Sequence, residues 1–157
     1  MLDADALNLL AENRTWLAFL PRNSILTPHP KEFDRLSEPS KTGYERLEKA
    51  RAFAVKFRVV LVLKGAHTAI CAPDGSVSFN STGNPGMAKG GSGDVLTGII
   101  TGLLAQGIPP LHAALAGVYL HGLAGDLAAE KMGWDALLPS DLIDHLPLAF
   151  KRIRGAV

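Results

Sequence analysis

The chain has 157 residues, enough for one domain with a substantial hydrophobic core but not for two. Hydrophobic residues make up 47% and charged residues 20%, a balance typical of globular proteins and unlike that of disordered ones. The formal net charge of +1 provides no overall field that would draw the chain to nucleic acid or to a membrane, so we expect neither as a partner.

Three features of the chain indicate its compartment. The single cysteine, Cys71, has apolar neighbours and cannot form an internal disulfide, so we expect a buried, unreactive thiol in a reducing environment. Asp3 and Asp5 follow Met1 closely, which is unlike a signal peptide. The apolar run Val95 to Ala105 is too short to span a bilayer and indicates a buried helix. We therefore expect a cytoplasmic protein.

The first elements in chain order are a helix and a short strand. Apolar residues over 7–17 recur at helical spacing, and Asp3 and Asp5 stand where helix-capping residues would be. We expect this helix to end near Phe19 to Pro21. The segment Ser24 to Pro28 then predicts a short buried strand that stops at its proline.

Two further helices are predicted next. Pro30 favours the first turn of a helix, with His29 as a turn residue and Glu32 as a partner of the helix dipole. Residues 37–41 form a polar loop, and residues 44–57 have helical spacing with a charged, solvent-facing side.

A continuous aliphatic run, residues 59–63, is typical of a strand buried on both faces in a parallel sheet. A Lys-Gly pair starting at Lys64 leaves this strand, and ligands of open α/β sheets bind at the carboxyl ends of strands. Lys64 is thus either well placed for a nucleotide or simply a lysine at a strand exit. Segments 68–72 and 77–80 flank the turn residues 73–76 and predict a hairpin.

The last third of the chain predicts three helices, over 95–106, 111–131 and 139–150. We expect the glycines within the first two to allow close packing against neighbouring elements, since each costs helix stability of about 1 kcal/mol relative to alanine. These glycines are Gly98, Gly102, Gly117, Gly122 and Gly125. The histidines of this region have no acid or cysteine partners at metal-binding spacing, so we expect core or surface residues; they are His112, His121 and His145. Helices alternating with buried strands indicate the α/β class.

A glycine-rich turn precedes the apolar helix and contains Gly90, Gly91, Ser92, Gly93 and Asp94. Glycine permits positive φ, so successive N–H groups can point into one concavity, and the helix that follows adds the positive end of its dipole. Such a site favours an anion. A carboxylate there would repel a phosphate, unless it accepts a proton from a hydroxyl that attacks phosphorus. The turn therefore predicts phosphoryl transfer.

The segment Asn84 to Leu96 resembles the signature of the ADP/ATP-dependent NAD(P)H-hydrate dehydratases, which belong to the ribokinase-like superfamily. Gly91-Ser92-Gly93-Asp94 matches the Gly-x-Gly-Asp turn of that superfamily, and Asn-Pro-Gly-Met-Ala in front makes the match specific. The resemblance implies a three-layer α/β sandwich. Since the family's domains are substantially longer, we expect residues 1–157 to form a single domain that is the C-terminal part of one, without its N-terminal part.

The resemblance also implies roles for individual residues. Asp94 would be the catalytic base, and the substrate would contact His29, Asn84 and Asp94. Glu32 would help to place Mg²⁺ through water. The nucleotide, ADP or ATP, would be bound by Lys64, Gly65, Ala66, His67, Thr68, Gly91, Ser92 and Gly93. Asp3 and Asp5 lie in a segment that borders the active site in the family. Lys89 either adds positive charge beside the phosphates or points to solvent.

The expected reaction is the ADP- or ATP-dependent dehydration of hydrated NADH or NADPH, because phosphorylation turns a poor leaving group, hydroxide, into phosphate. Two alternatives stay open. One is a ribokinase-like kinase for another small alcohol, and the other is a non-catalytic nucleotide-binding remnant. We also expect apolar surface left by an absent N-terminal part to promote homo-oligomer formation.

Overall fold

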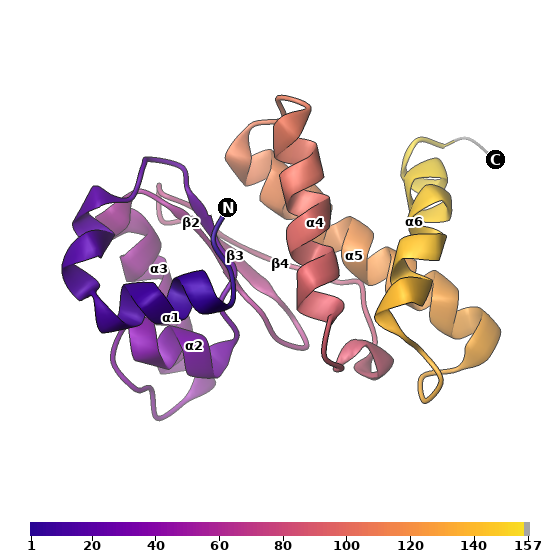
Figure 1. The fold of residues 1–157 in the computed structure, drawn as a ribbon, viewed down its shortest axis with the longest axis horizontal. Helices are drawn as coiled ribbons and strands as arrows, with labels where there is room; N and C mark the ends of the chain where they lie inside the picture. The colour runs from indigo at the N-terminus through magenta and orange to yellow at the C-terminus, as the bar shows by residue number, and fades with distance from the viewer. Residues whose placement is uncertain (156–157) are drawn as a thin grey trace.

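A mixed four-stranded sheet forms the centre of the fold, and helices cover both of its faces (Figure 1). The structure is a computed structural model and describes residues 1–155 of the chain. The first elements are α1 (Asp5–Glu12), the 3₁₀ helix η1 (Arg14–Phe19), β1 (Ile25–Leu26), α2 (Pro30–Leu36), α3 (Gly43–Phe57), β2 (Val60–Leu63), β3 (Ala69–Cys71) and β4 (Val77–Phe79). They are followed by the 3₁₀ helix η2 (Pro85–Met87), α4 (Ser92–Ala105), α5 (Pro110–Met132) and α6 (Pro139–Ile153).

Two hydrophobic cores lie on opposite faces of the sheet, because successive strand residues point to opposite sides. On one face, Leu26 and Leu61 pack with residues of α1, α2 and α3. On the other face, Val60 packs with Leu96 of α4 and Val118 of α5. The predicted α/β class and three-layer arrangement are confirmed.

The sheet has the order β1-β2-β3-β4. β1 and β2 are parallel, with Ile25 opposite Val60, while β2, β3 and β4 run antiparallel to one another. The prediction of a parallel environment for β2 is therefore right on one side only, since the short connection to β3 permits only an antiparallel neighbour. Leu2 forms a parallel bridge with Leu26, beyond β1.

The amino-terminal prediction was wrong in two respects. Neither Asp3 nor Asp5 caps a helix, because α1 begins at Asp5 behind Ala4, which has a φ of 49° and makes no side-chain cap. The carboxylate of Asp3 instead binds groups on β2 and α4, described below. The expected single helix ends at Glu12 and is followed by the separate helix η1.

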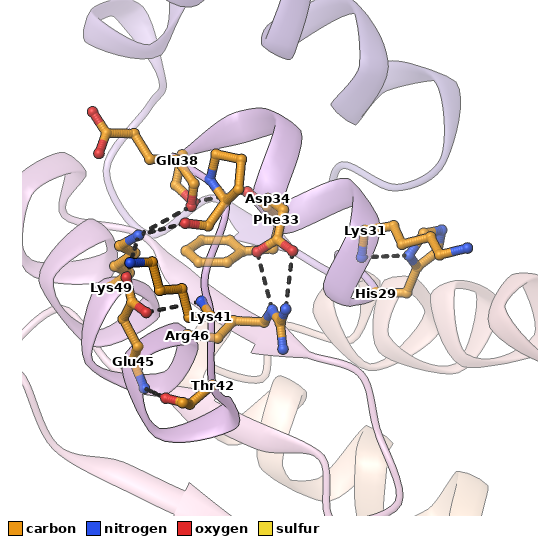
Figure 2. Close-up of polar contacts among 12 residues, drawn as sticks. His29, Lys31, Phe33, Asp34, Glu38, Lys41, Thr42, Glu45, Arg46 and Lys49 are labelled. Carbon is orange, nitrogen blue, oxygen red and sulfur yellow. Dashed lines mark hydrogen bonds and ion pairs between the residues drawn. The ribbon is translucent and has the colours of Figure 1, made fainter.

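The helices α2 and α3 are joined by a two-point ion pair. Arg46 of α3 donates from Nε to Asp34 Oδ1 at 3.0 Å and from Nη2 to Oδ2 at 2.9 Å (Figure 2). The hydrogen bonds from Arg46 lower the pKa of Asp34 below its ordinary value. This pair fixes the helical layer from which His29 and Glu32 approach the site.

The prediction that the helical glycines allow close packing is right for α5 and wrong for α4. An added Cβ at Gly117 would lie 2.6 Å from Ile100 Cγ1, one at Gly122 would lie 2.2 Å from Thr82 Oγ1, and one at Gly125 would lie 2.3 Å from Met87 Sδ, so close packing is confirmed there. At Gly98 and Gly102 an added Cβ would meet, apart from the nearby backbone of α4 itself, no atom of the described chain within 4 Å, and both are exposed. Close packing within this chain was therefore the wrong prediction for α4.

Cys71 is fully buried on β3, as predicted. Its burial raises the pKa of the thiol to about 11, which keeps the sulfur protonated and unreactive. Within residues 1–155, none of the helices combines the length and the apolar character that a bilayer crossing needs.

Candidate functional site

The glycine turn lies at the amino end of α4, where three other parts of the chain approach it. These are the segment at Asp3, the start of α2 at Glu32 and the carboxyl end of β2, which continues into Lys64. The arrangement follows from the topology, since β1 and β2 are parallel and end at the same edge of the sheet. The structure thereby brings together residues separated by up to 94 positions in the sequence.

The turn presents unpaired backbone N–H groups. Gly91 has a φ of 91°, a left-handed conformation that glycine adopts without strain, and it precedes the first residue of α4. The Ser92 N–H donates to the Lys89 carbonyl at 3.3 Å, whereas the N–H groups of Gly93 and Asp94 have no hydrogen-bond acceptor among residues 1–155. Two amides and the positive end of a 14-residue helix therefore face outward, which favours an anion.

The carboxylate of Asp94 lies beside these amides. Asp94 is exposed, and within the described chain its side chain forms no hydrogen bond or ion pair. It does not point into the core, and no protein group neutralises it. A carboxylate in this position is available to accept a proton from a bound hydroxyl group.

The ammonium of Lys64 lies over the same turn. A Cβ added to Gly93 would be 3.4 Å from Lys64 Nζ. Nζ is also 3.0 Å from Asp3 Oδ1 and 3.9 Å from Glu32 Oε2, and the side chain of Lys64 is 22% exposed. A positive charge thus lies beside the free amides, where it would add to their attraction for an anion.

Asp3 does not cap a helix, but its carboxyl group has a lowered pKa. Burial alone would raise the pKa of this carboxyl, but hydrogen bonds from Thr97, Lys64 and Thr27 and the charge of Lys64 together hold it below its ordinary value. The carboxylate therefore stays ionised beside Lys64 and Thr97.

His29 and Glu32 form a reciprocal cap at the start of α2. Glu32 Oε2 accepts from the His29 N–H at 2.7 Å, and His29 Nδ1 accepts from the N–H groups of Lys31 at 3.1 Å and Glu32 at 3.2 Å (Figure 2 shows the Lys31 bond). Because Nδ1 is an acceptor, a neutral His29 carries its proton on Nε2, which lies 3.4 Å from Glu32 Oε1. The His29 side chain is 44% exposed, so its ring remains accessible to a ligand.

The loop after β2 contains the other predicted nucleotide-binding residues. Gly65, Ala66 and His67 are exposed, and Thr68 Oγ1 donates to the Gly65 carbonyl at 3.2 Å. This bond closes the loop on itself and leaves its outer surface to solvent. Of this group, Lys64 is the residue whose side chain lies next to Gly93 of the glycine turn.

Asn84 supports the loop in front of the turn. Its Nδ2 donates to Asp126 Oδ1 at 2.9 Å, and its Oδ1 accepts from the Gly86 N–H at 3.1 Å. Lys89 lies at an exposed position, where its Nζ donates to the carbonyls of Asp135 at 2.7 Å and Leu137 at 2.8 Å. Its charge is thus used to hold the segment before α6 against the turn.

Sequence reasoning did not find His121 of α5 as part of the site. Its Nε2 lies 2.9 Å from the Ser92 carbonyl and 3.3 Å from Ser92 Oγ. Burial, with a smaller effect of the Lys64 charge, lowers the pKa of His121 to about 4, so the ring is neutral near pH 7. Asp3 and Thr97 were likewise not predicted to meet, and no local sequence pattern signals contacts over such separations.

Comparison with known proteins shows the family of the chain. The family model described as NAD(P)H-hydrate dehydratase matches residues 1–148. The bifunctional NAD(P)H-hydrate repair enzyme of Moorella thermoacetica is 49% identical over 159 residues, which cover 100% of this chain and 30% of that protein. The ADP-dependent (S)-NAD(P)H-hydrate dehydratase of Bacillus subtilis is 44% identical over 130 residues, or 82% of this chain and 47% of that protein.

Solved structures agree. The ADP/ATP-dependent NAD(P)H-hydrate dehydratase of Bacillus subtilis, co-crystallised with ATP and Mg²⁺, superposes with a TM-score of 0.79 at 43% identity, over 85% of this chain and 50% of that one. A ribokinase-like superfamily protein of Enterococcus faecalis gives a TM-score of 0.76 at 33% identity, over 96% of this chain and 51% of that one. This chain therefore spans about half the length of these relatives or less, and it belongs to the NAD(P)H-hydrate dehydratase family, with a ribokinase-like fold.

Proposed function

We propose that this chain carries the phosphoryl-transfer site for the ADP- or ATP-dependent dehydration of hydrated NADH and NADPH. The observation that supports this most directly is that, among the described residues, a free carboxylate and two free amide groups lie together at the start of α4. The Asp94 carboxylate is exposed and unpaired within residues 1–155, and the N–H groups of Gly93 and Asp94 have no acceptor there. Membership of the family supplies the identity of the substrates.

In the proposed reaction, Asp94 accepts the proton of the ring hydroxyl as its oxygen attacks the terminal phosphorus of the nucleotide. The oxygen–phosphorus bond to the remaining nucleotide breaks, and the amides of the turn stabilise the charge on the transferred group. The carbon–oxygen bond of the phosphorylated intermediate then breaks as phosphate leaves, and a proton lost from the neighbouring ring carbon restores the double bond. The barrier falls because phosphate is a better leaving group than hydroxide.

The remaining predicted residues have supporting roles in this proposal. Lys64 neutralises nucleotide phosphate charge, the loop over Gly65, Ala66, His67 and Thr68 contacts the nucleotide, and Gly91 and Ser92 shape the turn. His29 and Asn84 contact the hydrated nicotinamide. The exposed ring of His29 suits this role. The side-chain amide of Asn84 already bonds Asp126 and Gly86, so Asn84 would use its second amide hydrogen or the remaining lone pair of its oxygen.

Mg²⁺ fits this site as an ion held through water and phosphate oxygens. Within residues 1–155 no three acidic, histidine or cysteine side chains gather as a metal cage, and Mg²⁺ is commonly held by one or two carboxylates together with substrate phosphates. Glu32 Oε2 already accepts the His29 N–H, whereas Oε1 has, within the described chain, only the 3.4 Å contact with His29 Nε2 and is the oxygen better suited to a metal-bound water. When bound, Mg²⁺ would neutralise negative charge on the phosphates.

The decisive variant is Asp94→Asn, which keeps the size of the side chain and removes the base. Recovery of NADH absorbance at 340 nm from its hydrate, with ATP present, should fall by about two to four orders of magnitude while ATP affinity stays nearly unchanged. Asp144→Asn on the exposed side of α6 is the matched control and should leave the rate unchanged. Undiminished turnover by Asp94→Asn would contradict the assigned role.

The same assay separates the two alternative functions. A kinase for another small alcohol would produce a stable phosphorylated product, whereas the dehydratase releases inorganic phosphate together with NADH. A non-catalytic remnant would be stabilised thermally by ATP without any turnover. Because the chain spans about half of its relatives or less, the assay should include a full-length relative, such as the dehydratase of Bacillus subtilis, as a positive control.

We further propose a cytoplasmic homo-oligomer. The unpaired, buried Cys71 suits a reducing compartment, and several large apolar side chains are exposed, among them Phe19 at 81% and Tyr44 at 74%. Equilibrium sedimentation of the purified chain tests the assembly, and a monomer at all concentrations would refute it.

A further inference from the structure

The Asp3 carboxylate links the two elements that form the proposed anion site. Oδ1 lies 3.0 Å from Lys64 Nζ at the end of β2, and Oδ2 accepts a hydrogen bond of 2.6 Å from Thr97 Oγ1 on α4. Only 9% of the Asp3 side chain is exposed, so water competes weakly for these contacts. The segment that carries Asp3 is itself fixed, because the Leu2 N–H donates to the Ile25 carbonyl at 2.8 Å.

Lys64 needs such a partner to stay at the turn. A lysine has a flexible four-carbon stem, and holding its ammonium in one place costs rotamer entropy. Asp3 holds Nζ from one side, and Glu32 Oε2 lies 3.9 Å away. In this position Nζ lies 3.4 Å from where a Cβ on Gly93 would be, next to the unpaired amides.

Thr97 connects Asp3 to the helix that carries Asp94. It lies three residues after Asp94, so the two side chains lie on the same face of α4. The bond from Thr97 to Asp3 therefore also fixes the rotation of the helix whose amino end carries the base and the amides. Thr101, one turn further on, bonds only the Thr97 carbonyl of its own helix, at 2.7 Å.

We propose that Asp3 and Thr97 are positioning residues that hold the Lys64 ammonium over the glycine turn, in place to receive a nucleotide phosphate. Neither residue touches the substrate in this proposal. The identity of the anion rests on the proposed function, whereas the positioning of Lys64 rests on the contacts alone. Asp3 acts through Lys64, and Thr97 acts through Asp3.

The first test measures nucleotide affinity. Thr97→Val keeps the shape of the side chain and removes its donor, so the affinity for ATP measured by calorimetry should fall about tenfold, equivalent to about 1.4 kcal/mol. Thr97→Ser keeps the donor and should restore most of the affinity. Thr101→Val is the matched control, with the same change one turn away, and should leave the affinity unchanged. An equal loss in Thr101→Val, or none in Thr97→Val, would overturn the proposal.

The second test needs no ligand. Acetic anhydride labels exposed amines, and mass spectrometry of the peptides gives the labelling rate of Lys64 relative to the exposed Lys41. This ratio should rise at least severalfold in Asp3→Asn and Thr97→Val and stay at the wild-type value in Thr101→Val. Equal ratios in all four proteins would refute the positioning role.

The two tests separate this inference from the proposed function. If the unaltered chain fails to bind ATP, the proposed function fails for this chain, while the labelling ratio still decides whether Asp3 and Thr97 position Lys64. A loss of affinity that follows the thermal unfolding midpoint and is not rescued by Thr97→Ser would mean a merely structural contact and would reject the inference.

Discussion

Asn84 and Asp126 are joined by a hydrogen bond of 2.9 Å between Nδ2 and Oδ1, across 42 positions of the sequence. The other carboxylate oxygen of Asp126 accepts from the Gly83 N–H at 2.8 Å. One carboxylate on α5 therefore holds both the backbone and a side chain of the loop that leads into the glycine turn. The loop is fixed from α5 rather than by its own residues alone.

Asp126→Asn should destabilise the protein, because an amide N–H₂ would face the Gly83 N–H or the Asn84 Nδ2 in place of an acceptor. Loss of one hydrogen bond to a charged group lowers the free energy of unfolding by about 1.5 to 3 kcal/mol. Urea denaturation followed by circular dichroism measures the change. Asp135→Asn, at an exposed position, is the control with the same chemical change, and equal stability of both variants would contradict the role.

Of two alanine substitutions in the glycine turn, one should mainly lower ATP affinity and the other should mainly lower stability. At Gly93 the backbone φ is ordinary and the added methyl group would only touch Lys64 Nζ at 3.4 Å, so stability should change little. The methyl group would occupy the space where we place the phosphate, and ATP affinity should fall at least about tenfold. Calorimetric titration checks this, and unchanged affinity would place the anion elsewhere.

Gly91→Ala should instead lower stability, because alanine at a φ of 91° is strained and its Cβ would lie 3.1 Å from Pro139 Cγ. We expect a loss of about 1 to 3 kcal/mol, measured by denaturation. A stable Gly91→Ala variant would show that the turn can adopt another backbone conformation.

Alanine substitutions at two helical glycines should change the free energy of unfolding in opposite directions. Gly98→Ala adds a methyl group on an open, exposed surface of α4 and should raise the free energy of unfolding by about 0.5 to 1 kcal/mol. Gly122→Ala would place its Cβ 2.2 Å from Thr82 Oγ1 and 2.7 Å from the Thr82 carbonyl carbon, so it should destabilise by about 1 to 3 kcal/mol. Thermal unfolding of the two variants provides the comparison, and a stable Gly122→Ala would be contrary to this packing.

His121 should make stability depend on pH below neutrality. Its folded-state pKa is about 4, against the ordinary value of 6.5, so the unfolded chain binds a proton more readily. Its contribution is complete well above pH 6.5 and is lost as pH falls towards 4, by roughly 3 kcal/mol. His121→Gln can keep the donor to Ser92 but cannot titrate, so its unfolding free energy should fall less over this range. If the unfolding free energies of the wild type and of His121→Gln fell equally with pH, His121 would not be the group responsible.

Much of the fold could be predicted from local pattern. The hairpin after β2 follows from its turn residues 73–76, the start of α2 from Pro30, and the buried strand β2 from its aliphatic run. The glycine turn and the exposed Asp94 were identified because their chemistry is contained within a few consecutive residues. Such features need no knowledge of distant contacts.

The rest depends on tertiary contacts that periodicity does not encode. Asp3 has the residue type and place of a helix cap, yet its carboxylate binds Lys64 and Thr97. The same limit explains Gly98, where a glycine in a helix was interpreted as a packing site although no other described element packs against it. His121 was missed because its partner, Ser92, belongs to another helix.

The contact between Asp3 and Thr97 also bears on how the protein is made. At translation rates of roughly 5 to 20 residues per second, the 94 positions between them mean that Asp3 is synthesised about 5 to 20 seconds before Thr97. During that interval its carboxylate lacks the Thr97 hydroxyl, and the amino end of α4 does not yet exist. The corner formed by Asp3, Lys64 and Thr97 can therefore assemble only after the sheet strands have been synthesised.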